Sequence, residues 1–207
     1  KPGPFMSAED NFEITLKGSG GPALMPRKTR GGMVAACALA MRAQTVVSRR
    51  LDPTETAVVS VTEIFTDGVR NVLPGSVRIL GDTRSFSSLV SAEIERQLRM
   101  IAKGTAEAYG LEVEMKYTRE FIPTINDLEL TGEALSVASD LFGESNVQML
   151  KKTGGGSEDF ARFLAHVPGC YANFGNGPNS QPLHNPLYDF NDGGLIHGAR
   201  YHAAIAR

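Results

Sequence analysis

The fold of the first half of the chain is decided by the stretch Asn11-Phe12-Glu13-Ile14-Thr15-Leu16-Lys17. Phe12, Ile14 and Leu16 alternate with polar residues, and this period of two is typical of a strand with one buried face. The same alternation returns in the stretch Leu111-Glu112-Val113-Glu114-Met115-Lys116-Tyr117-Thr118. The two stretches predict strands that open and close one structural unit.

Four further elements are predicted between these strands. They are a helix over 33–49, strands over 57–65 and 76–84, and a long helix that Ser87 or Ser88 can cap. The resulting order, β-α-β-β-α-β, predicts an α+β, ferredoxin-like sandwich in which two helices cover one face of an antiparallel sheet.

The second half of the chain alternates short strands with helices. The predicted elements are helices over 128–142, 157–166 and 194–206 and short apolar strands over 147–150 and 170–174. This alternation indicates an α/β layer, but two short strands amount to only part of a sheet. We therefore expect two domains, over residues 1–119 and 120–207, of which the second needs something else to complete its core.

Composition excludes several classes of function. The chain has 207 residues with 21 Lys and Arg against 23 Asp and Glu, a net charge of −2. Nucleic-acid and acidic-membrane partners need a basic surface, so we expect neither. No apolar run approaches the roughly 20 residues of a membrane span. Cys37 and Cys170 are too few and too far apart for a disulfide scaffold, which favours a reducing, cytoplasmic setting.

A glycine-rich loop, Gly154-Gly155-Gly156-Ser157, precedes a predicted helix. Its backbone N–H groups could hold an anion, but the Gly-Lys-Ser/Thr ending of a phosphate loop is absent. Ser157, an aspartate at 189 or 192 and a histidine at 197 or 202 follow the chain order of an α/β-hydrolase triad. That nucleophile turn needs glycine two positions after the serine, where Asp159 stands. The sequence therefore disfavours a phosphate loop and a serine-hydrolase triad without excluding either.

Among the four histidines, His184 is the candidate metal ligand. It lies in the loop Gln181-Pro182-Leu183-His184-Asn185-Pro186, whose prolines can hold an imidazole in one orientation. Asp189, Asn191 and Asp192 follow, so a nearby carboxylate could be a partner for the ring. His166 sits at a predicted helix end, and His197 and His202 are five apart, which does not place both on one helical face. A catalytic zinc site normally has three protein ligands, and no obvious set appears.

Two further residues are candidates for binding a substrate. Arg84 ends a predicted strand in Gly81-Asp82-Thr83-Arg84-Ser85, where a guanidinium could grip a carboxylate with two hydrogen bonds. Asn71, in the connection between two strands, could add an amide donor. Taken alone, both patterns also describe a surface arginine and a turn asparagine.

Seven motifs in sequence order together resemble a known family. They are Gly20-Gly21-Pro22-Ala23-Leu24-Met25-Pro26, Gln44-Thr45-Val46-Val47-Ser48-Arg49, Asn71-Val72-Leu73-Pro74, Gly81-Asp82-Thr83-Arg84-Ser85, Pro123-Thr124-Ile125-Asn126-Asp127, Ser157-Glu158-Asp159-Phe160 and His184-Asn185-Pro186-Leu187-Tyr188-Asp189-Phe190-Asn191-Asp192. The chain resembles, over its whole length, the zinc metallopeptidases and amidohydrolases that include hippurate hydrolases, aminoacylases and indole-acetyl-amino-acid hydrolases.

The resemblance implies a division of labour between the two domains. Residues 1–119 would form a ferredoxin-like lid that also makes a homodimer, and residues 120–207 the C-terminal part of a zinc-peptidase-like catalytic domain. His184 matches the last metal ligand of the family, for zinc or another divalent metal. Asn71 and Arg84 match lid residues that hold the substrate, an N-acyl amino acid or small peptide. Glu158 and Asp159 match a helix-start motif with an architectural role.

The chain also departs from the family pattern. The remaining metal ligands and the general-base glutamate precede the lid in the family, and nothing before Asp10 can supply them, so we assign no catalytic residue here. Where the family has Gly-His-Ala, this chain has Gly21-Pro22-Ala23, and the later Pro-His is Pro26-Arg27. Proline cannot stabilise an oxyanion, so that contribution should be lost.

Two hypotheses for the function follow. In the first, the chain is the C-terminal part of a metal-dependent amidohydrolase and is inactive alone. In the second, it is a non-catalytic dimerisation module derived from such an enzyme. Both predict a homodimer, because an exposed edge strand of the lid can pair with its copy across a two-fold axis.

Overall fold

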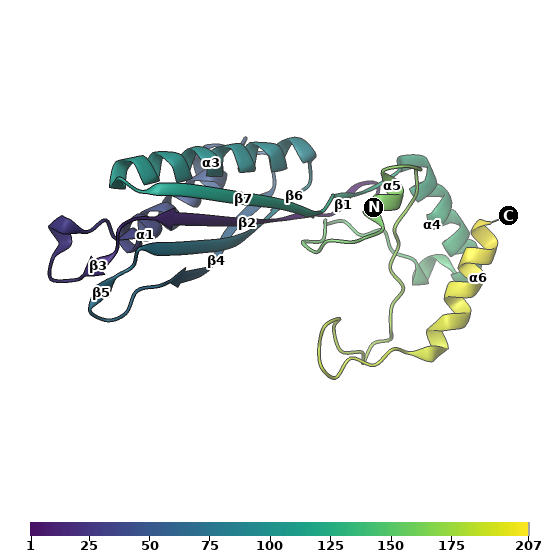
Figure 1. Ribbon diagram of the computed structural model, residues 1–207. Coiled ribbons are helices and arrows are strands. Elements are labelled where there is room, and N and C mark those ends of the chain that lie inside the picture. Colours follow the sequence, from purple (N-terminus) through teal and green to yellow (C-terminus); the bar gives the residue numbers. More distant parts are fainter. Residues whose placement is uncertain (207) are drawn as a thin grey trace. The chain divides into compact units, whose positions relative to one another are not determined.

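The computed structural model describes residues 1–206, and its internal contacts divide the chain into two compact units. The first, here called the sheet unit, comprises Met6–Thr124 and Gly154–Ala161. The second, the helical unit, comprises Lys1–Phe5, Ile125–Thr153 and the chain from Arg162 onward. The boundary expected between residues 119 and 120 falls inside strand β7 (Glu112–Phe121; Figure 1).

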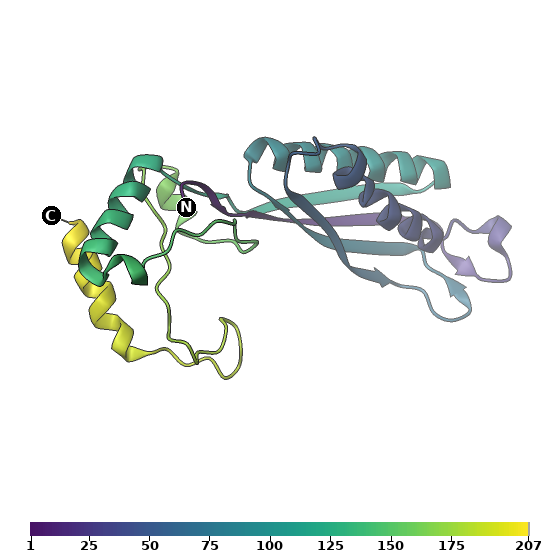
Figure 2. The same ribbon diagram turned by 180° about the vertical axis from the view of Figure 1, so that it is seen from behind.

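The sheet unit is built on a four-stranded antiparallel sheet with strand order β4-β6-β2-β7. Its strands are β2 (Ala8–Lys17), β4 (Ala57–Thr66), β6 (Ser76–Ser85) and β7. Helices α1 (Gly32–Ala43) and α3 (Ser88–Tyr109) lie side by side on one face, as Figures 1 and 2 show. The predicted α+β architecture with an antiparallel sheet is therefore confirmed, and the elements follow in the predicted chain order.

One apolar core fills the space between the sheet and these two helices. Ile14 and Leu16 of β2 and Ile79 of β6 are fully buried there, as are Leu39 of α1 and Leu98 of α3. Full burial of each such side chain contributes about 1.5–3 kcal/mol relative to exposure. The alternating pattern of β2 therefore places every second side chain in this core and leaves the others on the open face of the sheet.

Helix α3 begins at a capping serine and ends at a glycine, and these two residues explain its bounds. The Ser87 hydroxyl accepts a hydrogen bond from the Leu89 N–H at 3.2 Å, so the predicted cap is confirmed. Gly110 ends the helix in the left-handed conformation, at φ 64°, and Arg30 donates from Nη1 to its carbonyl oxygen at 3.1 Å. The predicted 33–49 helix is divided into α1 and a short helix α2 (Thr45–Arg49).

Two loops meet at the end of the sheet unit where β2 ends and β6 begins. Strand β3 (Gly21–Pro22) pairs antiparallel with β5 (Val72–Leu73), and the 3-10 helix η1 (Pro26–Lys28) follows β3. Gly20 permits this approach, because its φ is +52° and a Cβ there would lie 2.9 Å from the backbone nitrogen of Gly75. These two loops, residues 18–30 and 67–75, are here called the tip.

The helical unit has α4 (Leu128–Phe142), α6 (Leu195–Ile205) and several short elements. These are β1 (Gly3–Met6), which pairs with β8 (Thr124–Asn126), the 3-10 helices η2 (Glu144–Asn146) and η3 (Asp192–Gly194), and α5 (Ala161–Leu164). Helix α4 begins at the Asp127 cap, whose side chain accepts from the Leu130 N–H at 3.0 Å. Within residues 1–206, no helix is long and apolar enough to cross a membrane.

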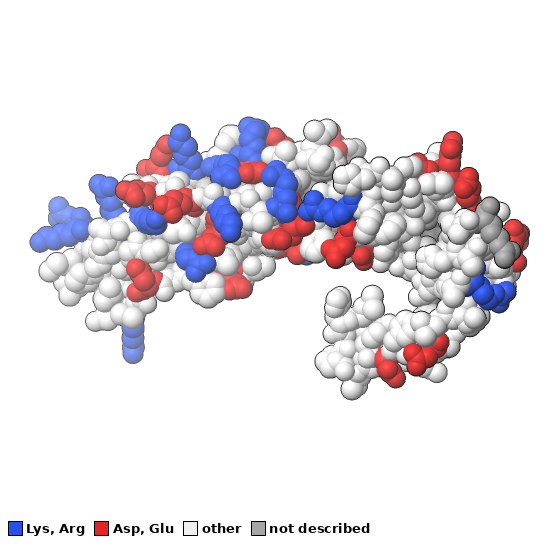
Figure 3. Space-filling view, turned by 45° about the vertical axis from the view of Figure 1, so that its right-hand side comes forward, with Lys and Arg blue, Asp and Glu red and all other residues white. Residues whose placement is uncertain are grey.

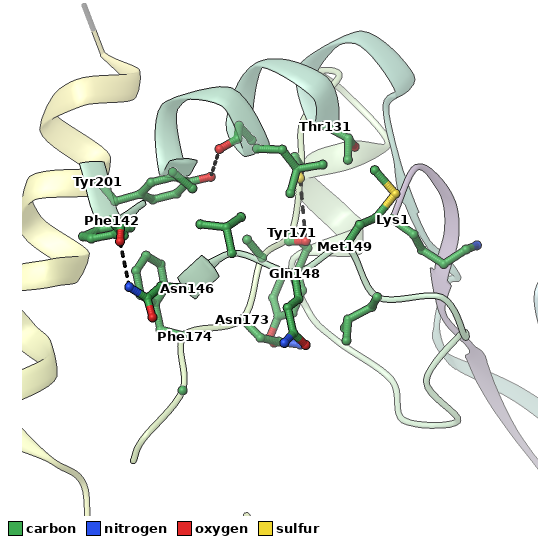
Figure 4. Close-up of a pocket in the computed structure, with 18 of the residues that line it drawn as sticks. Lys1, Thr131, Phe142, Asn146, Gln148, Met149, Tyr171, Asn173, Phe174 and Tyr201 are labelled. Atoms are coloured by element: carbon green, nitrogen blue, oxygen red, sulfur yellow. Dashed lines mark hydrogen bonds between the residues drawn. The ribbon is translucent and has the colours of Figure 1, made fainter. Parts of the chain in front are cut away.

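The strands predicted over 147–150 and 170–174 are wrong, because neither segment is a strand in the structure. A strand exists only where a neighbouring strand accepts its hydrogen bonds, and both of these segments instead line a cavity of about 640 Å³. Figure 4 shows Tyr201, Phe142 and Phe174 gathered at one end of this cavity. The ring centroids of Phe174 and Tyr201 lie 5.3 Å apart.

The helix predicted over 157–166 is also largely wrong, since only Ala161–Leu164 is helical. The residues before it are held instead by Ser7, which precedes strand β2, and by Glu9 of that strand. The Ser7 backbone N–H donates to the Gly156 carbonyl at 2.9 Å, and the Ser157 hydroxyl donates to Glu9. These long-range contacts override the local helical preference.

Candidate functional site

His184 has a left-handed backbone conformation. Its φ is +67°, the only positive value for a residue other than glycine among residues 1–206. The left-handed region disfavours side chains with a Cβ, and such residues often mark functional sites. The turn around it is closed by Asn185, whose N–H donates to the Pro182 carbonyl at 3.2 Å and whose Oδ1 accepts from Leu187 at 2.8 Å.

The side chain of Asn176 forms hydrogen bonds with both ends of the loop that carries His184. Its Oδ1 accepts from the Asn191 N–H at 2.7 Å, and its Nδ2 donates to the Ser180 hydroxyl at 2.7 Å and to the Asp189 carbonyl at 2.8 Å. This network fixes a long loop that has almost no regular structure. His184 therefore lies on an exposed loop whose ends are held by hydrogen bonds to Asn176.

The fit of this site to a metal can be judged from its donor set. Within residues 1–206, no group of three or more His, Cys, Asp or Glu side chains is placed to hold a metal ion. Asp189 and Asp192, the two carboxylates expected near the ring, are both exposed, and the backbone carbonyl of Asp189 is bonded to Asn176. The described residues alone therefore do not fit a complete metal centre, because a catalytic site normally uses three protein ligands.

Arg84 lies on the open face of the sheet, between two carboxylates. Its Nε is 2.8 Å from Asp82 Oδ1, and its Nη1 is 2.9 Å from Glu9 Oε2. The arginine side chain is 26% exposed, so these pairs are partly shielded from water. One cation between two anions leaves the cluster with a net negative charge, and a substrate carboxylate would have to share the guanidinium with Glu9.

Ser157 completes this cluster from the returning segment Gly154–Ala161. Its hydroxyl donates to Glu9 Oε2 at 2.6 Å, and Arg84 Nη1 lies 3.5 Å from the same hydroxyl. A triad serine needs an imidazole as its base, and here the serine is bonded to a carboxylate. The Gly155 and Gly156 carbonyls accept from the Ser7 hydroxyl at 2.9 and 3.2 Å, so the glycine-rich loop is docked on the first residues of the sheet unit.

Asn71 occupies a corner of the tight turn Val69–Val72. The Val72 N–H donates to the Val69 carbonyl at 2.9 Å and the Val69 N–H to the Val72 carbonyl at 3.3 Å, so Arg70 and Asn71 are the two central residues. The Ala23 N–H donates to the Asn71 carbonyl at 3.0 Å. The structure therefore brings together two motifs that are far apart in the sequence, the one with Pro22 and the one with Asn71.

The two candidate substrate residues lie toward opposite ends of strand β6. Asn71 is in the turn just before Ser76, where β6 begins, and Arg84 is next to its end. At about 3.3 Å per residue, the strand from Ser76 to Arg84 spans roughly 26 Å. One N-acyl amino acid cannot bridge that distance, so within one chain Asn71 and Arg84 cannot hold the same small substrate.

The other histidines lie away from these residues. His197 on α6 packs its ring edge-on against Phe142, with centroids 5.7 Å apart, and His202 lies 5.8 Å from the Tyr201 ring. His166 is in the turn after α5, where its N–H donates to the Phe163 carbonyl. His197 and His202 therefore pack against aromatic rings of the helical unit.

Two residues that organise these sites were not identified in the sequence. Glu9 is one of several charged residues that alternate along β2, and nothing local marks it as the partner of Arg84. Asn176 precedes Gly177, and an Asn-Gly pair indicates a turn, but the loop-bracing role of its side chain depends on residues 13 and 15 positions later. Both roles arise from long-range contacts.

Comparison with known proteins extends this description. The model of "Peptidase family M20/M25/M40" matches residues 4–207. An N-acetylcysteine deacetylase of Bacillus subtilis is 30% identical over 206 residues, which cover 100% of this chain and 53% of the relative. A hippurate hydrolase of Campylobacter jejuni is 32% identical over 206 residues, or 100% of this chain and 54% of the relative.

Solved structures give the same result. A putative aminohydrolase from methicillin-resistant Staphylococcus aureus superposes with a TM-score of 0.88 at 26% identity, covering 100% of this chain and 52% of that one. A dinuclear metal-binding peptidase of the M20 family from Bacillus subtilis gives a TM-score of 0.80 at 25% identity, covering 100% of this chain and 51% of that one. The chain thus spans about half the length of the relatives that it matches.

Proposed function

This chain belongs to peptidase family M20/M25/M40, a family of hydrolases, and on that basis we propose that it is the C-terminal part of a metal-dependent amidohydrolase. The family resemblance seen in the seven motifs is thereby confirmed. The proposed substrates are N-acyl amino acids or small peptides, as the names of the deacetylase and the hippurate hydrolase suggest. Because the chain spans about half of those relatives, we expect it to be inactive alone.

The observation that carries this proposal is the conformation of His184. A histidine held at φ +67° on a braced loop, inside the motif that matches the family's last metal ligand, supports a role in binding zinc or another divalent metal. No group of three or more His, Cys, Asp or Glu side chains in residues 1–206 is placed to hold a metal ion, and the proposal therefore takes the other ligands from outside these residues. A metal-binding relative of 25% identity supports the same assignment.

We further propose that the sheet unit is a ferredoxin-like lid that forms a homodimer. Strand β4 is at an edge of the sheet and carries the exposed apolar residues Val58, Ile64 and Phe65, the last of them 49% exposed. An unpaired edge with apolar side chains favours pairing with a second copy. Such a dimer would also explain the distance between Asn71 and Arg84, if each substrate is held by Arg84 of one chain and Asn71 of the other.

The homodimer is tested by sedimentation at tens of micromolar. The expected species is a dimer, and Phe65→Glu should shift it toward monomer by placing a charge at the edge strand. Leu89→Glu is the matched control, because Leu89 is 81% exposed on α3, away from β4. A monomeric wild-type chain, or equal effects of the two substitutions, would contradict the proposed dimer.

One observation favours the alternative of a non-catalytic dimerisation module. Pro22, which replaces the family's lid histidine, is locked in a ladder with Val72 and cannot stabilise an oxyanion. In that case the remaining metal ligands need not exist in the same protein. A cytoplasmic location belongs to both versions of the proposal and stays a prediction from the low cysteine content.

The deciding experiment is to read the coding sequence upstream of Lys1 and to assay the protein that it encodes. The amidohydrolase proposal expects an upstream His-x-Asp and Glu-Glu, bound metal measured by elemental mass spectrometry, and hydrolysis of an N-acyl amino acid. His184→Ala should remove metal and activity, whereas His166→Ala should leave both. A start codon directly before Lys1, with a folded dimer that binds no metal, would establish the module instead.

A further inference from the structure

Glu9 connects three parts of the sheet unit through one carboxylate oxygen. It lies directly opposite Arg84 in the β2–β6 register, and its Oε2 is 2.9 Å from Arg84 Nη1. The same oxygen accepts the Ser157 hydroxyl at 2.6 Å. Strand β2, strand β6 and the returning segment Gly154–Ala161 therefore meet at a single atom.

These residues line a groove on the open face of the sheet. The groove has a volume of about 690 Å³, and Glu9, Asp82 and Arg84 line it together with Thr62 of β4 and Lys116 of β7. The Arg84 side chain is 26% exposed, so a molecule in the groove can reach its guanidinium. A space of this size suits a small-molecule ligand.

Arg84 has one donor edge that is only half used. Its Nε is 2.8 Å from Asp82 Oδ1 and its Nη1 is next to Glu9, whereas its Nη2 makes no hydrogen bond within residues 1–206. A carboxylate binds a guanidinium best through two parallel hydrogen bonds. A second carboxylate can therefore use Nη1 and Nη2 together only if Glu9 leaves Nη1.

The departure of Glu9 from Arg84 also affects Ser157. Within residues 1–206, Arg84 and Ser157 are the two side chains that hold the Glu9 carboxylate. A carboxylate arriving on Arg84 repels Glu9, because two like charges about 4 Å apart disfavour each other. Since one oxygen serves both partners, its movement away from Arg84 also breaks the bond to Ser157. The bonds from Ser7 to the Gly155 and Gly156 carbonyls do not involve this oxygen.

Ion pairing alone does not distinguish Glu9 from other carboxylates of the sheet unit. Figure 3 shows blue and red side chains close together over α3 and β7. On the open face, Arg78 donates to Glu13 at 2.7 Å, and Glu13 is on the same strand as Glu9. Glu13 has no hydrogen bond to the returning segment, whereas Glu9 has one. The second bond is therefore the distinctive property of Glu9.

We propose that Glu9 is an internal competitor for a carboxylate ligand of Arg84, and that Glu9, Arg84 and Ser157 form a latch. A carboxylate that enters the groove takes Arg84 from Glu9 and releases the part of the returning segment that begins at Ser157. The inference rests on the proposed function in taking Arg84 as a contact for the substrate. It adds Glu9 as a positioning residue, and by linkage carboxylate binding and release of the segment each favour the other.

The test measures carboxylate binding and release of the segment on the full chain. The probes are N-acetylglycine, its neutral amide and sodium chloride at equal ionic strength, because salt alone weakens ion pairs. The NMR signal of the Arg84 Nε–H reports binding. The rate of chymotrypsin cleavage after Phe160 reports release, with a peptide substrate as the reference for protease activity.

We expect N-acetylglycine to shift the Arg84 signal and to speed cleavage after Phe160 about fivefold, the factor for one lost hydrogen bond. The amide and the salt should do neither. Glu9→Gln removes the competing charge and keeps an acceptor of the same shape. It should tighten N-acetylglycine binding about fivefold and speed cleavage without ligand about fivefold, because neutral acceptors form weaker hydrogen bonds.

Glu13→Gln is the matched control, because it removes the same charge from the same face of the same strand. It should leave the cleavage rate and its response to N-acetylglycine as in the wild type. Ser157→Ala changes no charge and should also tighten N-acetylglycine binding, since the ligand then breaks one bond fewer. Unchanged core amide shifts show that each variant is folded.

Equal behaviour of Glu9→Gln and Glu13→Gln would overturn the latch, as would a shifted Arg84 signal with no change in cleavage. The readout needs neither metal nor hydrolysis. If the upstream sequence encodes no catalytic half while N-acetylglycine still releases the segment, the proposed amidohydrolase fails and the latch stands. If hydrolysis is found while cleavage after Phe160 does not respond, the latch fails alone.

Discussion

The sheet unit and the helical unit differ in how many apolar side chains they bury. The sheet unit places fully buried leucine, isoleucine and valine side chains from strands and helices in one core. Among the described residues of the helical unit, Phe5, Ala134 and Tyr201 are the buried apolar residues, whereas Phe163 and Phe174 are 65% and 47% exposed. A sheet with helices on one face needs no further partner, but helices with extended segments beside them lack the sheet that would cover their apolar faces.

The largest expected difference is in hydrogen exchange. Amides of the core strands, such as Ile79, should exchange only through global unfolding, whereas Leu150 and Phe174 have no backbone partner among residues 1–206. Opening energies near zero against a global stability of about 5 kcal/mol or more predict exchange at least about a thousandfold faster in those segments. Mass spectrometry of exchanged peptides measures this. Equal protection of 147–150, 170–174 and β6 would contradict the contrast.

A pair of leucine truncations compares the two units directly. Leu98→Ala removes a fully buried side chain from the core of the sheet unit and should lower the free energy of unfolding by about 2–5 kcal/mol. Leu195→Ala makes the same chemical change at a residue of α6 that is 59% exposed, and should stay within about 0.5 kcal/mol. Urea unfolding followed by circular dichroism gives both values. A large loss for Leu195→Ala would mean that the helical unit has a complete core.

A buried polar network gives the sheet unit a pH dependence. The Tyr117 hydroxyl donates to Asp10 Oδ2 at 3.0 Å and lies 2.8 Å from the Thr83 hydroxyl. Burial, together with the charge of Asp10, raises the pKa of Tyr117. Because the folded chain holds this proton more tightly, the stability it provides is complete below the unfolded pKa of about 10 and is lost as the pH rises toward the raised pKa.

Tyr117→Phe should therefore cost about 1–2 kcal/mol at neutral pH, because Asp10 loses one of its donors. The variant should also lose less stability than the wild type between pH 9 and about 11. Tyr109→Phe is the control, since Tyr109 is 39% exposed at the end of α3. Parallel pH profiles for the wild type and Tyr117→Phe would rule out Tyr117 as the titrating group.

The smallest expected effect concerns the returning segment of the sheet unit. Ser157→Ala removes the hydroxyl that binds Glu9 and should lower the free energy of unfolding by about 1 kcal/mol. Ser136→Ala, at an exposed position of α4, should be neutral. Limited proteolysis should cut residues 154–161 faster in Ser157→Ala than in Ser136→Ala. Unchanged cutting would show that the segment is held by its backbone bonds to Ser7 alone.

The elements of the sheet unit could be predicted from local patterns, because the residues that form, begin and end each element are close together in the sequence. The alternation in β2, the Ser87 cap and the stop at Gly110 each reflect a local requirement, and each is present in the structure. The same rules failed over 147–150 and 170–174 because an apolar run predicts a strand only if a neighbour exists to pair with it. They failed over 157–160 because Ser7 and Glu9 hold that segment.

The sequence by itself determined the family, the order of elements in the sheet unit and the identity of His184, Asn71 and Arg84 as candidates, because motifs and periodicity are properties of neighbouring residues. Only the tertiary structure decided how these candidates are used. It paired Arg84 with Glu9, held His184 in a left-handed conformation, and put Asn71 in a turn of the tip, roughly a strand's length from Arg84. These relations depend on contacts between residues far apart in the chain, which no local pattern records.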